Sequence, residues 1–334
     1  MMTYPIVALI YYQFFYTFLE KKDFRFDTFF KSLFYLQVFL IVFIIFEAFY
    51  SKKLDTFMDY IHSNDLKYWR IRLLTYEESW VGSIITIISF LNMYLVTYLD
   101  KRKIVMLVTY LSSIFFIIFY SIRSESKGYL LVFLISALPL LIQYLYNNKK
   151  TRKFLIIGIV CIFSLGITLF FSLKEFVFQQ LYSSITFGTR FSSYLSAIST
   201  FAYHPLGVGW GPYLCFYPNN LIDVINSDIM SPFNLEEVKL YLNDTKSLSS
   251  KTYFFDNLVF GGIPFLLFYF IFFIKRYIYF SKLKIQQLAF IRIPLLYVIL
   301  SSLLYVTFSI KYEVWFFMAF LDVLQKKIKS KVLV

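Results

Sequence analysis

Residues 100–123 read DKRKIVMLVTYLSSIFFIIFYSIR, and this stretch decides the class of fold. A block of basic residues precedes the run 104–121, which holds no charged side chain. A bilayer core of roughly 30 Å is crossed by about 20 apolar residues in a helix, with a range of about 17–25. The run is continuous rather than alternating, which excludes a strand of a membrane barrel. The stretch therefore predicts a membrane-spanning helix with a basic anchor at one end.

Other stretches of the chain have the same character, and together they predict an all-α polytopic membrane protein with about nine transmembrane helices. The first and last of these stretches are short, and the region 286–325 is either a hairpin or one broken helix. The predicted helices are 4–19, 33–50, 80–99, 104–121, 129–146, 154–172, 257–274, 286–306 and 312–325.

The composition agrees with this class. Of 334 residues, 59% are hydrophobic and only 16% are charged, against roughly a quarter in soluble domains. Two cysteines exclude a disulfide-rich secreted scaffold, and Cys161 and Cys215 lie in dissimilar segments. The net charge of +13 would suggest nucleic acid in a soluble protein. Here most basic residues lie in short loops and set topology instead, so we expect no nucleic-acid partner.

The basic residues also predict the orientation. More than half of the 33 Lys and Arg residues fall in five short segments that lie on one side, so this is the cytoplasmic side. The C-terminus is then cytoplasmic. With nine helices the N-terminus is outside, where it lacks a basic flank, so either a further N-terminal helix precedes it or one of the nine is not a span. The five segments are 20–32, 100–103, 147–153, 275–285 and 326–334.

We expect residues 1–334 to form a single integral membrane domain with two large outward loops, 51–79 and 173–256. Loops of such length without a function are uncommon. Within the second loop, residues 191–203 are predicted to form a helix that re-enters the bilayer or lies along it. Leu235, Val238 and Leu242 have helical spacing, which predicts a short surface helix in 234–248.

Polar residues on the outer face are the candidates for chemistry. Arg190 precedes the 191–203 helix and offers a planar guanidinium that can hold a diphosphate bidentately; the alternative is an arginine that reaches for lipid headgroups. Gly207 and Gly209 can bring backbone N–H groups close to a ligand, or simply form a turn. His204 is a base, a hydrogen-bond donor or a structural residue.

Further candidates flank the predicted helices. Arg123 lies at the outer end of 104–121, and Arg72 and Glu78 precede the helix 80–99. Asp256 and Asn257 stand at the mouth of another apolar run, where a simple helix cap is the alternative. Arg292 is interpreted as structural. With two histidines in different loops, a histidine-rich metal site is not expected, and the sequence suggests no metal or cofactor.

The order of these motifs resembles the O-antigen ligase and repeat-unit polymerase superfamily, which contains Wzy-type polymerases and WaaL-type ligases. The resemblance rests on Arg190, HPLGVGWG at 204–211 and DNLVFGGIPFLLFYF at 256–270. SIRSESKGYLLVFLI at 121–135 and RLLTYEESWVGSIIT at 72–86 are similar to two upstream family motifs. Asp256 fills the position of a frequent family histidine, so the ligase role of that histidine is not carried over.

The resemblance implies a GT-C-like fold in a bacterial inner membrane. It also implies inverting, metal-independent glycosyl transfer between undecaprenyl-diphosphate-linked oligosaccharides, with a chain-length regulator and a flippase as possible partners. Arginines such as Arg190, Arg123 and Arg72 would stabilise the developing charge of the lipid diphosphate. Glu78, His204 and Asp256 would be candidates for orienting or deprotonating the acceptor hydroxyl.

Gly207, Gly209 and Asn257 are the candidate substrate contacts in these motifs, and Trp210, Tyr213 and Tyr217 could stack on sugar rings. Within the same chemistry, a ligase that acts on lipid A core is the nearest alternative. A transporter of lipid-linked oligosaccharide is the alternative from another class, but its polar residues should lie at mid-membrane in repeated helix pairs.

Overall fold

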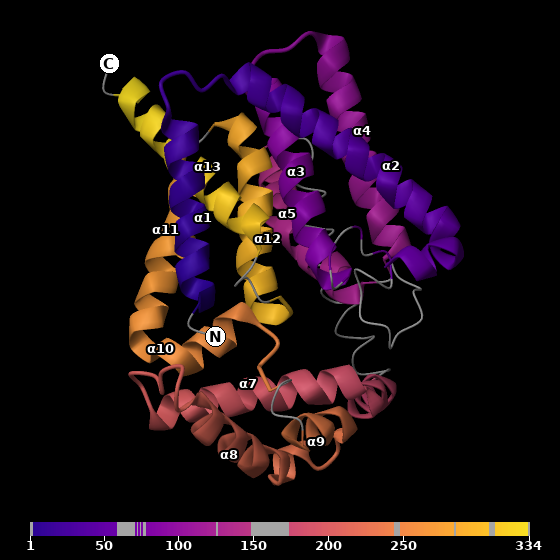
Figure 1. The fold of residues 1–334 in the computed structure, drawn as a ribbon, viewed down its shortest axis with the longest axis vertical. Coiled ribbons are helices and arrows are strands. Elements are labelled where there is room, and N and C mark those ends of the chain that lie inside the picture. Colours follow the sequence, from indigo (N-terminus) through magenta and orange to yellow (C-terminus); the bar gives the residue numbers. More distant parts are fainter. Residues whose placement is uncertain are drawn as a thin grey trace. The chain divides into compact units, whose positions relative to one another are not determined.

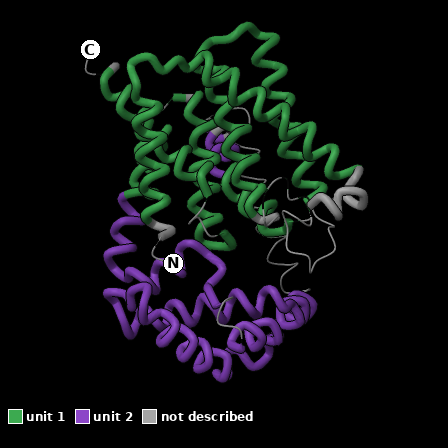
Figure 2. The backbone as a smooth tube through the Cα atoms, in the orientation of Figure 1, with its two compact units in different colours: residues 1–137, 272–334 green, residues 138–271 purple. Residues whose placement is uncertain are grey.

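The computed structural model describes residues 3–58, 71, 73, 75, 78–124, 126–147, 174–243, 248–283, 285–306 and 311–332. Within these ranges every regular element is a helix (Figure 1). The chain divides into two compact units, coloured separately in Figure 2. Unit 1 comprises Met1–Ala137 and Phe272–Val334, and unit 2 comprises Leu138–Ile271.

Unit 1 is a bundle of long apolar helices. Its elements are α1 (Thr3–Glu20), α2 (Phe26–Met58), α3 (Glu78–Tyr98), α4 (Lys103–Arg123), the first part of α5 (Lys127–Asn147), α11 (Lys275–Lys282), the 3-10 turn η4 (Gln286–Leu288), α12 (Ala289–Leu304) and α13 (Tyr312–Val332).

Unit 2 is built from shorter helices. They are a helical segment at 174–183, α7 (Ile185–Tyr203), α8 (Tyr213–Ile225), the 3-10 turn η1 (Asp228–Met230), α9 (Glu236–Asn243) and α10 (Tyr253–Tyr269). A π-helical turn, η3 (Phe270–Ile274), continues α10 into α11.

The prediction of a helical membrane fold is confirmed. The predicted apolar stretches all fall on helices, except 154–172, which lies outside the described residues. Four helical segments of the described chain are long and apolar enough to cross a membrane, and three further helices are apolar but shorter. The count of nine spans therefore stays a prediction. The four segments are Phe26–Phe49, Trp80–Tyr98, Lys103–Arg123 and Tyr253–Lys282.

Helix α3 lies at the centre of unit 1, where it contacts α2, α4, α12 and α13. Buried polar side chains join it to these neighbours. The Ser83 hydroxyl donates to Glu313 on α13 over 2.6 Å, and the Asn92 amide donates to Gln37 on α2 over 2.8 Å. Gln37 in turn donates to Ser113 on α4 over 3.1 Å. Between apolar helices in a membrane, such bonds and close packing supply the association that hydrophobic burial cannot.

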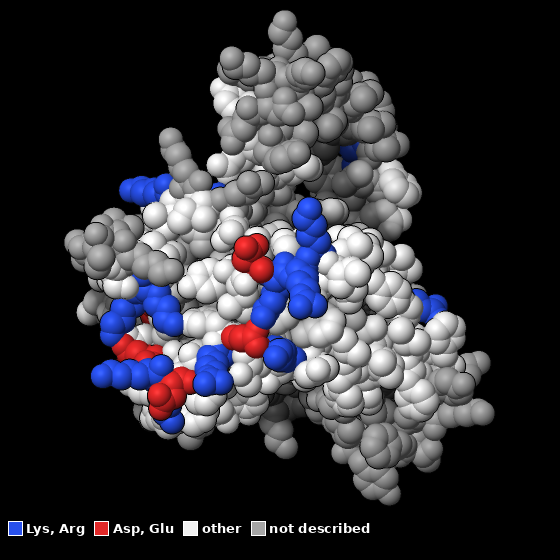
Figure 3. Space-filling model, turned by 90° about the horizontal axis from the view of Figure 1, so that it is seen from above, with Lys and Arg blue, Asp and Glu red and all other residues white. Residues whose placement is uncertain are grey.

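Charged side chains gather at one end of unit 1, as Figure 3 shows. Lys101, at the connection between α3 and α4, pairs with Asp27 at the start of α2, which also pairs with Lys31. Lys326 on α13 pairs with Glu20 at the end of α1. These pairs lie in segments that the sequence assigns to the cytoplasmic side, so the structure brings several basic segments to one face. The side of the membrane itself stays a prediction.

Arg292 is structural, as expected, but it does not reach toward headgroups. Its side chain lies in the first turn of α12 and is only 7% exposed. The guanidinium donates to the carbonyl oxygens of Phe280 over 3.0 Å and Leu283 over 2.5 Å, at the end of α11. It thus satisfies carbonyls that a helix end leaves without a partner. The arginine ties α11 to α12.

The region 173–256 is not an extended polar loop, because most of its described residues are helical. Helix α9 confirms the short helix expected within 234–248. Helix α8 was not predicted, since Pro218 and Asn219–Asn220 interrupt its apolar pattern. The predicted single integral domain is not tested by this local folding and stays a prediction.

Candidate functional site

Arg190 lies inside helix α7 rather than before it, which corrects the predicted start at residue 191. The helix begins six residues earlier, at Ile185, because the Ser184 hydroxyl accepts a hydrogen bond from the Phe187 N–H and caps it. Arg190 is half-buried and interacts with the hydroxyl of Tyr194, one turn further along the helix. Burial raises the pKa of Tyr194, and the charge of Arg190 acts in the opposite direction.

The serine-rich face of α7 is its buried face. Ser192, Ser193 and Ser196 are at most 3% exposed, whereas Ile198 is 47% exposed. Small side chains let helices approach closely. A Cβ at Gly188 would lie 2.1 Å from the Asn234 carbonyl oxygen, so glycine is required where α7 meets the segment before α9.

Asp256 and Asn257 lie in the first turn of α10, which the Thr252 hydroxyl caps by accepting from the Phe255 N–H. The Asp256 carboxylate accepts a hydrogen bond from the Ser250 N–H over 2.7 Å. The Asn257 amide donates to the Tyr253 carbonyl over 2.7 Å. One Asp256 oxygen is thus paired with the Ser250 N–H. The Asn257 amide donates to the backbone of its own helix.

Arg190 and Asp256 are linked through stacked rings. The Tyr194 ring stacks on Phe255, with centroids 4.6 Å apart and planes at 19°. Phe255 precedes Asp256 on α10, so this stack brings the part of α7 that bears Arg190 next to the turn of α10 that bears Asp256. This part of the site joins residues that are far apart in the sequence.

The two glycine-containing motifs form one structure. Helix α10 is broken at Gly262, where φ is 49° and ψ is −133°. Pro264 has no N–H to donate to the Phe260 carbonyl, and this carbonyl accepts instead from Gly209 over 3.0 Å. The Val208 N–H donates to Val259 over 2.9 Å, and the Ile263 N–H donates to Pro205 over 2.8 Å. The loop therefore supplies the backbone partners that the broken helix lacks.

The glycines of this structure serve close backbone packing. A Cβ at Gly207 would lie 2.5 Å from the Phe260 carbonyl oxygen, and Gly207 and Gly209 have φ of 84° and 71°. Their N–H groups donate to the carbonyls of His204 and Phe260. The expectation that these amides point at a ligand is therefore wrong for this conformation, because both are already donated within the protein.

His204 and Trp210 flank this loop. His204 is the C-cap of α7, directly after Tyr203. Its ring meets Phe216 edge-on, with the ring centroids 4.4 Å apart. It is half-buried, which leaves open the structural and chemical roles considered for it. Trp210 is 36% exposed and its ring lies 6.0 Å from Phe260. Trp210 remains available for a stacking contact.

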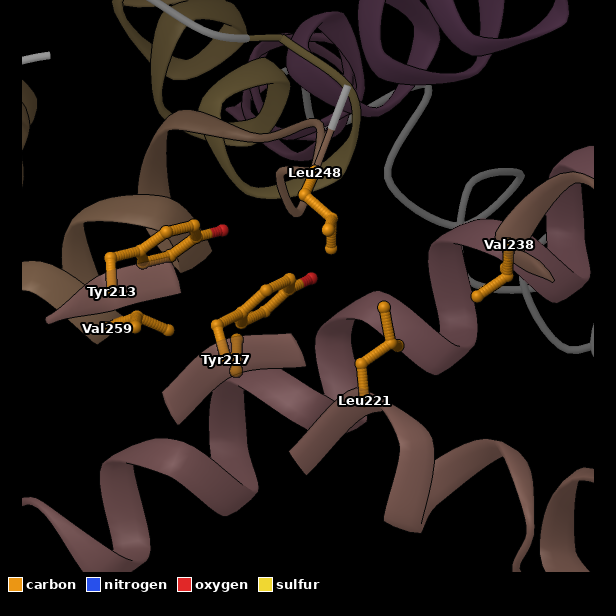
Figure 4. Close-up of a cluster of buried hydrophobic side chains, with 7 residues drawn as sticks. Tyr213, Tyr217, Leu221, Val238, Leu248 and Val259 are labelled. Carbon is orange, nitrogen blue, oxygen red and sulfur yellow. The ribbon is translucent and has the colours of Figure 1, made fainter. Parts of the chain in front are cut away.

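Tyr213 and Tyr217 belong to the core of unit 2, so the expectation that they stack on sugar rings is wrong. Their rings stack on each other at 4.9 Å and are 1% and 0% exposed. In Figure 4 the two rings lie side by side among Leu221, Leu248 and Val259. Burial raises the pKa of both tyrosines well above the ordinary value, and the charge of Asp256 adds to the rise.

The remaining candidates lie in unit 1. Arg123, at the end of α4, is exposed and its guanidinium lies 3.4 Å from the Ala48 carbonyl oxygen on α2. Arg72 lies outside the described residues. Glu78 is the first residue of α3, and its side chain lies outside the described part. The structure thus groups Arg190, His204, Gly207, Gly209, Trp210, Asp256 and Asn257 in unit 2 and Arg123 and Glu78 in unit 1.

Two buried charges in unit 1 were missed in the sequence. Glu47 is fully buried and accepts the Leu73 N–H over 2.9 Å. Lys311 is 2% exposed and donates to the Ser83 hydroxyl over 3.0 Å, with Glu313 3.9 Å away. A lone acid in the apolar run FIIFEAFY was a usable signal for Glu47, since charges in such runs are costly and often functional. Lys311 stands beside a short loop and gave no such signal.

The described residues of unit 2 place a cation, a carboxylate, an imidazole and an exposed indole on one helical framework. An arginine can stabilise charge that develops on a phosphate oxygen, and a carboxylate can orient a hydroxyl. In the part of the chain that the structure describes, no group of three or more metal-ligating residues gathers.

Comparisons with known proteins give one weak relative. No protein-family model matches the chain, and no solved structure matches it. The relative is a Klebsiella pneumoniae protein described as an uncharacterized 49.5 kDa protein in the cps region. It is 28% identical over 216 residues, which cover 62% of this chain and 47% of the relative. The match thus spans about half the length of that protein.

Proposed function

We propose that the chain is a surface-polysaccharide repeat-unit polymerase, of the O-antigen or capsule kind, in the bacterial inner membrane. It transfers glycans between undecaprenyl-diphosphate-linked oligosaccharides on the outer face of that membrane. The observation that carries this proposal is the stack of Tyr194 on Phe255, which brings the part of α7 that bears Arg190 next to the first turn of α10, where Asp256 lies. A cation for the diphosphate and an acid for the acceptor hydroxyl are the two groups that such a transfer requires.

The genomic association of the relative supports the same class of function. The name of the Klebsiella protein places it in the cps region, an abbreviation used for capsular polysaccharide. A helical membrane protein fits a substrate that is itself anchored in lipid. The motif order that resembles the polymerase superfamily runs through unit 2, from Arg190 to the broken helix α10.

The test is glycan chain length in a deletion strain that carries each variant on a plasmid. Deletion should leave material with single repeat units. Arg190→Ala should do the same, because loss of one preorganised donor to a developing charge costs on the order of 10²–10³ in rate. Arg190→Lys should restore activity only in part, since an ammonium cannot hold two phosphate oxygens in a fork.

Lys239→Ala is the matched control. Lys239 is an exposed cation on α9 in the same unit, outside the residues argued to act. It should give wild-type chains, and a membrane blot should show equal amounts of all variants. Wild-type chains from Arg190→Ala would remove Arg190 from the site. If the deletion strain carried no repeat unit at all on its lipid A core, the protein would instead be a ligase.

A further inference from the structure

Unit 2 carries an apolar patch at the junction of α7 and α8. We define it by five side chains that are exposed to solvent: Tyr203 (75%), Leu206 (74%), Trp210 (36%), Leu214 (50%) and Phe216 (39%). The segment 203–216 contains no Lys, Arg, Asp or Glu. An uncharged segment with several large exposed apolar side chains is a candidate contact with a partner or a membrane.

The patch is fastened to a helix that is apolar and long enough to cross a membrane. Backbone hydrogen bonds join Val208 and Gly209 to Val259 and Phe260 of α10. A third bond runs from the Ile263 N–H to the Pro205 carbonyl. The candidate span that contains these α10 residues runs from Tyr253 to Lys282. The loop that bears Leu206 and Trp210 is therefore held at a fixed position along this span, and that position sets its depth in the membrane.

The break at Gly262 shows what that depth is. Between the break and Lys275, the first basic residue of a segment that the sequence assigns to the cytoplasmic side, lie only the 12 residues 263–274, or roughly 18 Å of helix at 1.5 Å per residue. A hydrocarbon core of roughly 30 Å therefore extends past the break toward the start of α10. The break, and the loop bonded to it, then lie at the level of the outer leaflet.

We propose that the apolar patch seats unit 2 in the outer leaflet of the membrane. Tyr203 and Trp210 occupy the headgroup level that such amphipathic rings favour, and Leu206 and Leu214 reach the acyl chains. A lipid surface is the occupant that fits, because the loop that bears Leu206 and Trp210 is hydrogen-bonded to a candidate membrane span, and the patch brings no charge that would have to lose water. This inference holds for any activity of unit 2.

Cys215 allows a direct test, since it is exposed and lies between Leu214 and Phe216. The full chain with Cys161→Ser is labelled at Cys215 with a nitroxide and reconstituted in phosphatidylcholine–phosphatidylglycerol vesicles. The rate at which the nitroxide collides with oxygen, which dissolves in lipid, is compared with the rate at which it collides with a polar nickel chelate. The oxygen rate should exceed the chelate rate by roughly threefold or more, because a polar chelate is excluded from the apolar region.

The control label is placed at Ile229→Cys with Cys161 and Cys215 replaced by Ser. Ile229 is 64% exposed on η1 and lies outside the patch, so its label should favour the chelate. Preference for the chelate at Cys215 would overturn the proposal. Protection of Cys215 from both reagents would overturn it as well, because protein, either another part of the chain or a second copy, would then cover the patch.

A substitution keeps the test independent of the label. Leu206→Glu should shift Cys215 toward the chelate, whereas Leu240→Glu should leave its accessibility unchanged. Leu240 is 66% exposed on α9 and matches Leu206 in residue type and exposure. Equal accessibility in both variants would contradict insertion of Leu206. The Arg190 variants test the proposed reaction separately, so either result can fail without the other.

Discussion

Gly262→Ala is the substitution for which the structure makes the sharpest prediction. Gly262 interrupts α10 in a left-handed conformation, with φ at 49°. An added Cβ would lie 2.2 Å from the Pro205 carbonyl oxygen and 2.4 Å from the Gly207 nitrogen. Both are backbone atoms, so no change of rotamer can relieve the overlap. The loop 205–209 must move away from the helix.

Two contributions determine how much Gly262→Ala lowers the free energy of unfolding. A left-handed conformation costs a residue with a Cβ roughly 1–2 kcal/mol. Moving the loop also breaks the three backbone bonds that join it to α10, each worth about 1 kcal/mol. The free energy of unfolding should therefore fall by about 4 kcal/mol, which lowers the melting temperature on the order of 5–10 °C.

Two glycines of the segment between α7 and α8, which packs against the break in α10, provide graded controls. Gly209→Ala should cost only the conformational strain, about 1–2 kcal/mol, since φ is 71° but its Cβ would meet no atom closer than 4.0 Å. Gly211→Ala should be neutral, because nothing lies within 4 Å of its Cβ. Thermal unfolding of purified protein in detergent measures all three variants. Equal melting temperatures for the Gly262 and Gly211 variants would refute the backbone contact between loop and helix.

Three further substitutions test the packing. Arg292→Lys should lower the melting temperature, because an ammonium lacks the planar fork by which two guanidinium nitrogens reach the Phe280 and Leu283 carbonyls; an unchanged value would count against the role of Arg292 in joining α11 to α12. Asn92→Leu should destabilise unit 1 by about 1–3 kcal/mol, since the buried Gln37 loses a donor, and thermal unfolding should show the loss. Tyr213→Phe should leave the melting temperature unchanged or higher, because its buried hydroxyl has no hydrogen-bond partner among the described residues; a clear decrease would show that this hydroxyl is bonded.

Arg190 illustrates how far the candidate site could be predicted. Its residue type and the motif order made it a candidate without any coordinates. The start of its helix was misplaced because the Ser184 cap lies in a segment whose polarity suggested a loop. The contact of Tyr194 with Phe255 joins residues about sixty positions apart, and no local pattern encodes such a pairing. The burial of Tyr213 and Tyr217 was missed because tyrosine suits both an interface and a core.

The sequence by itself determined the helical membrane class, the apolar stretches and the candidates Arg190, His204 and Asp256, since uncharged length and residue chemistry are local properties. Only the tertiary structure decided that the loop of Gly207 and the break at Gly262 are one structure. The physical reason is that each motif leaves backbone groups without partners, and those groups find one another only when the chain folds back on itself. The tertiary structure likewise decided that the serine face of α7 is buried, because closely packed helices accommodate small side chains better than large ones.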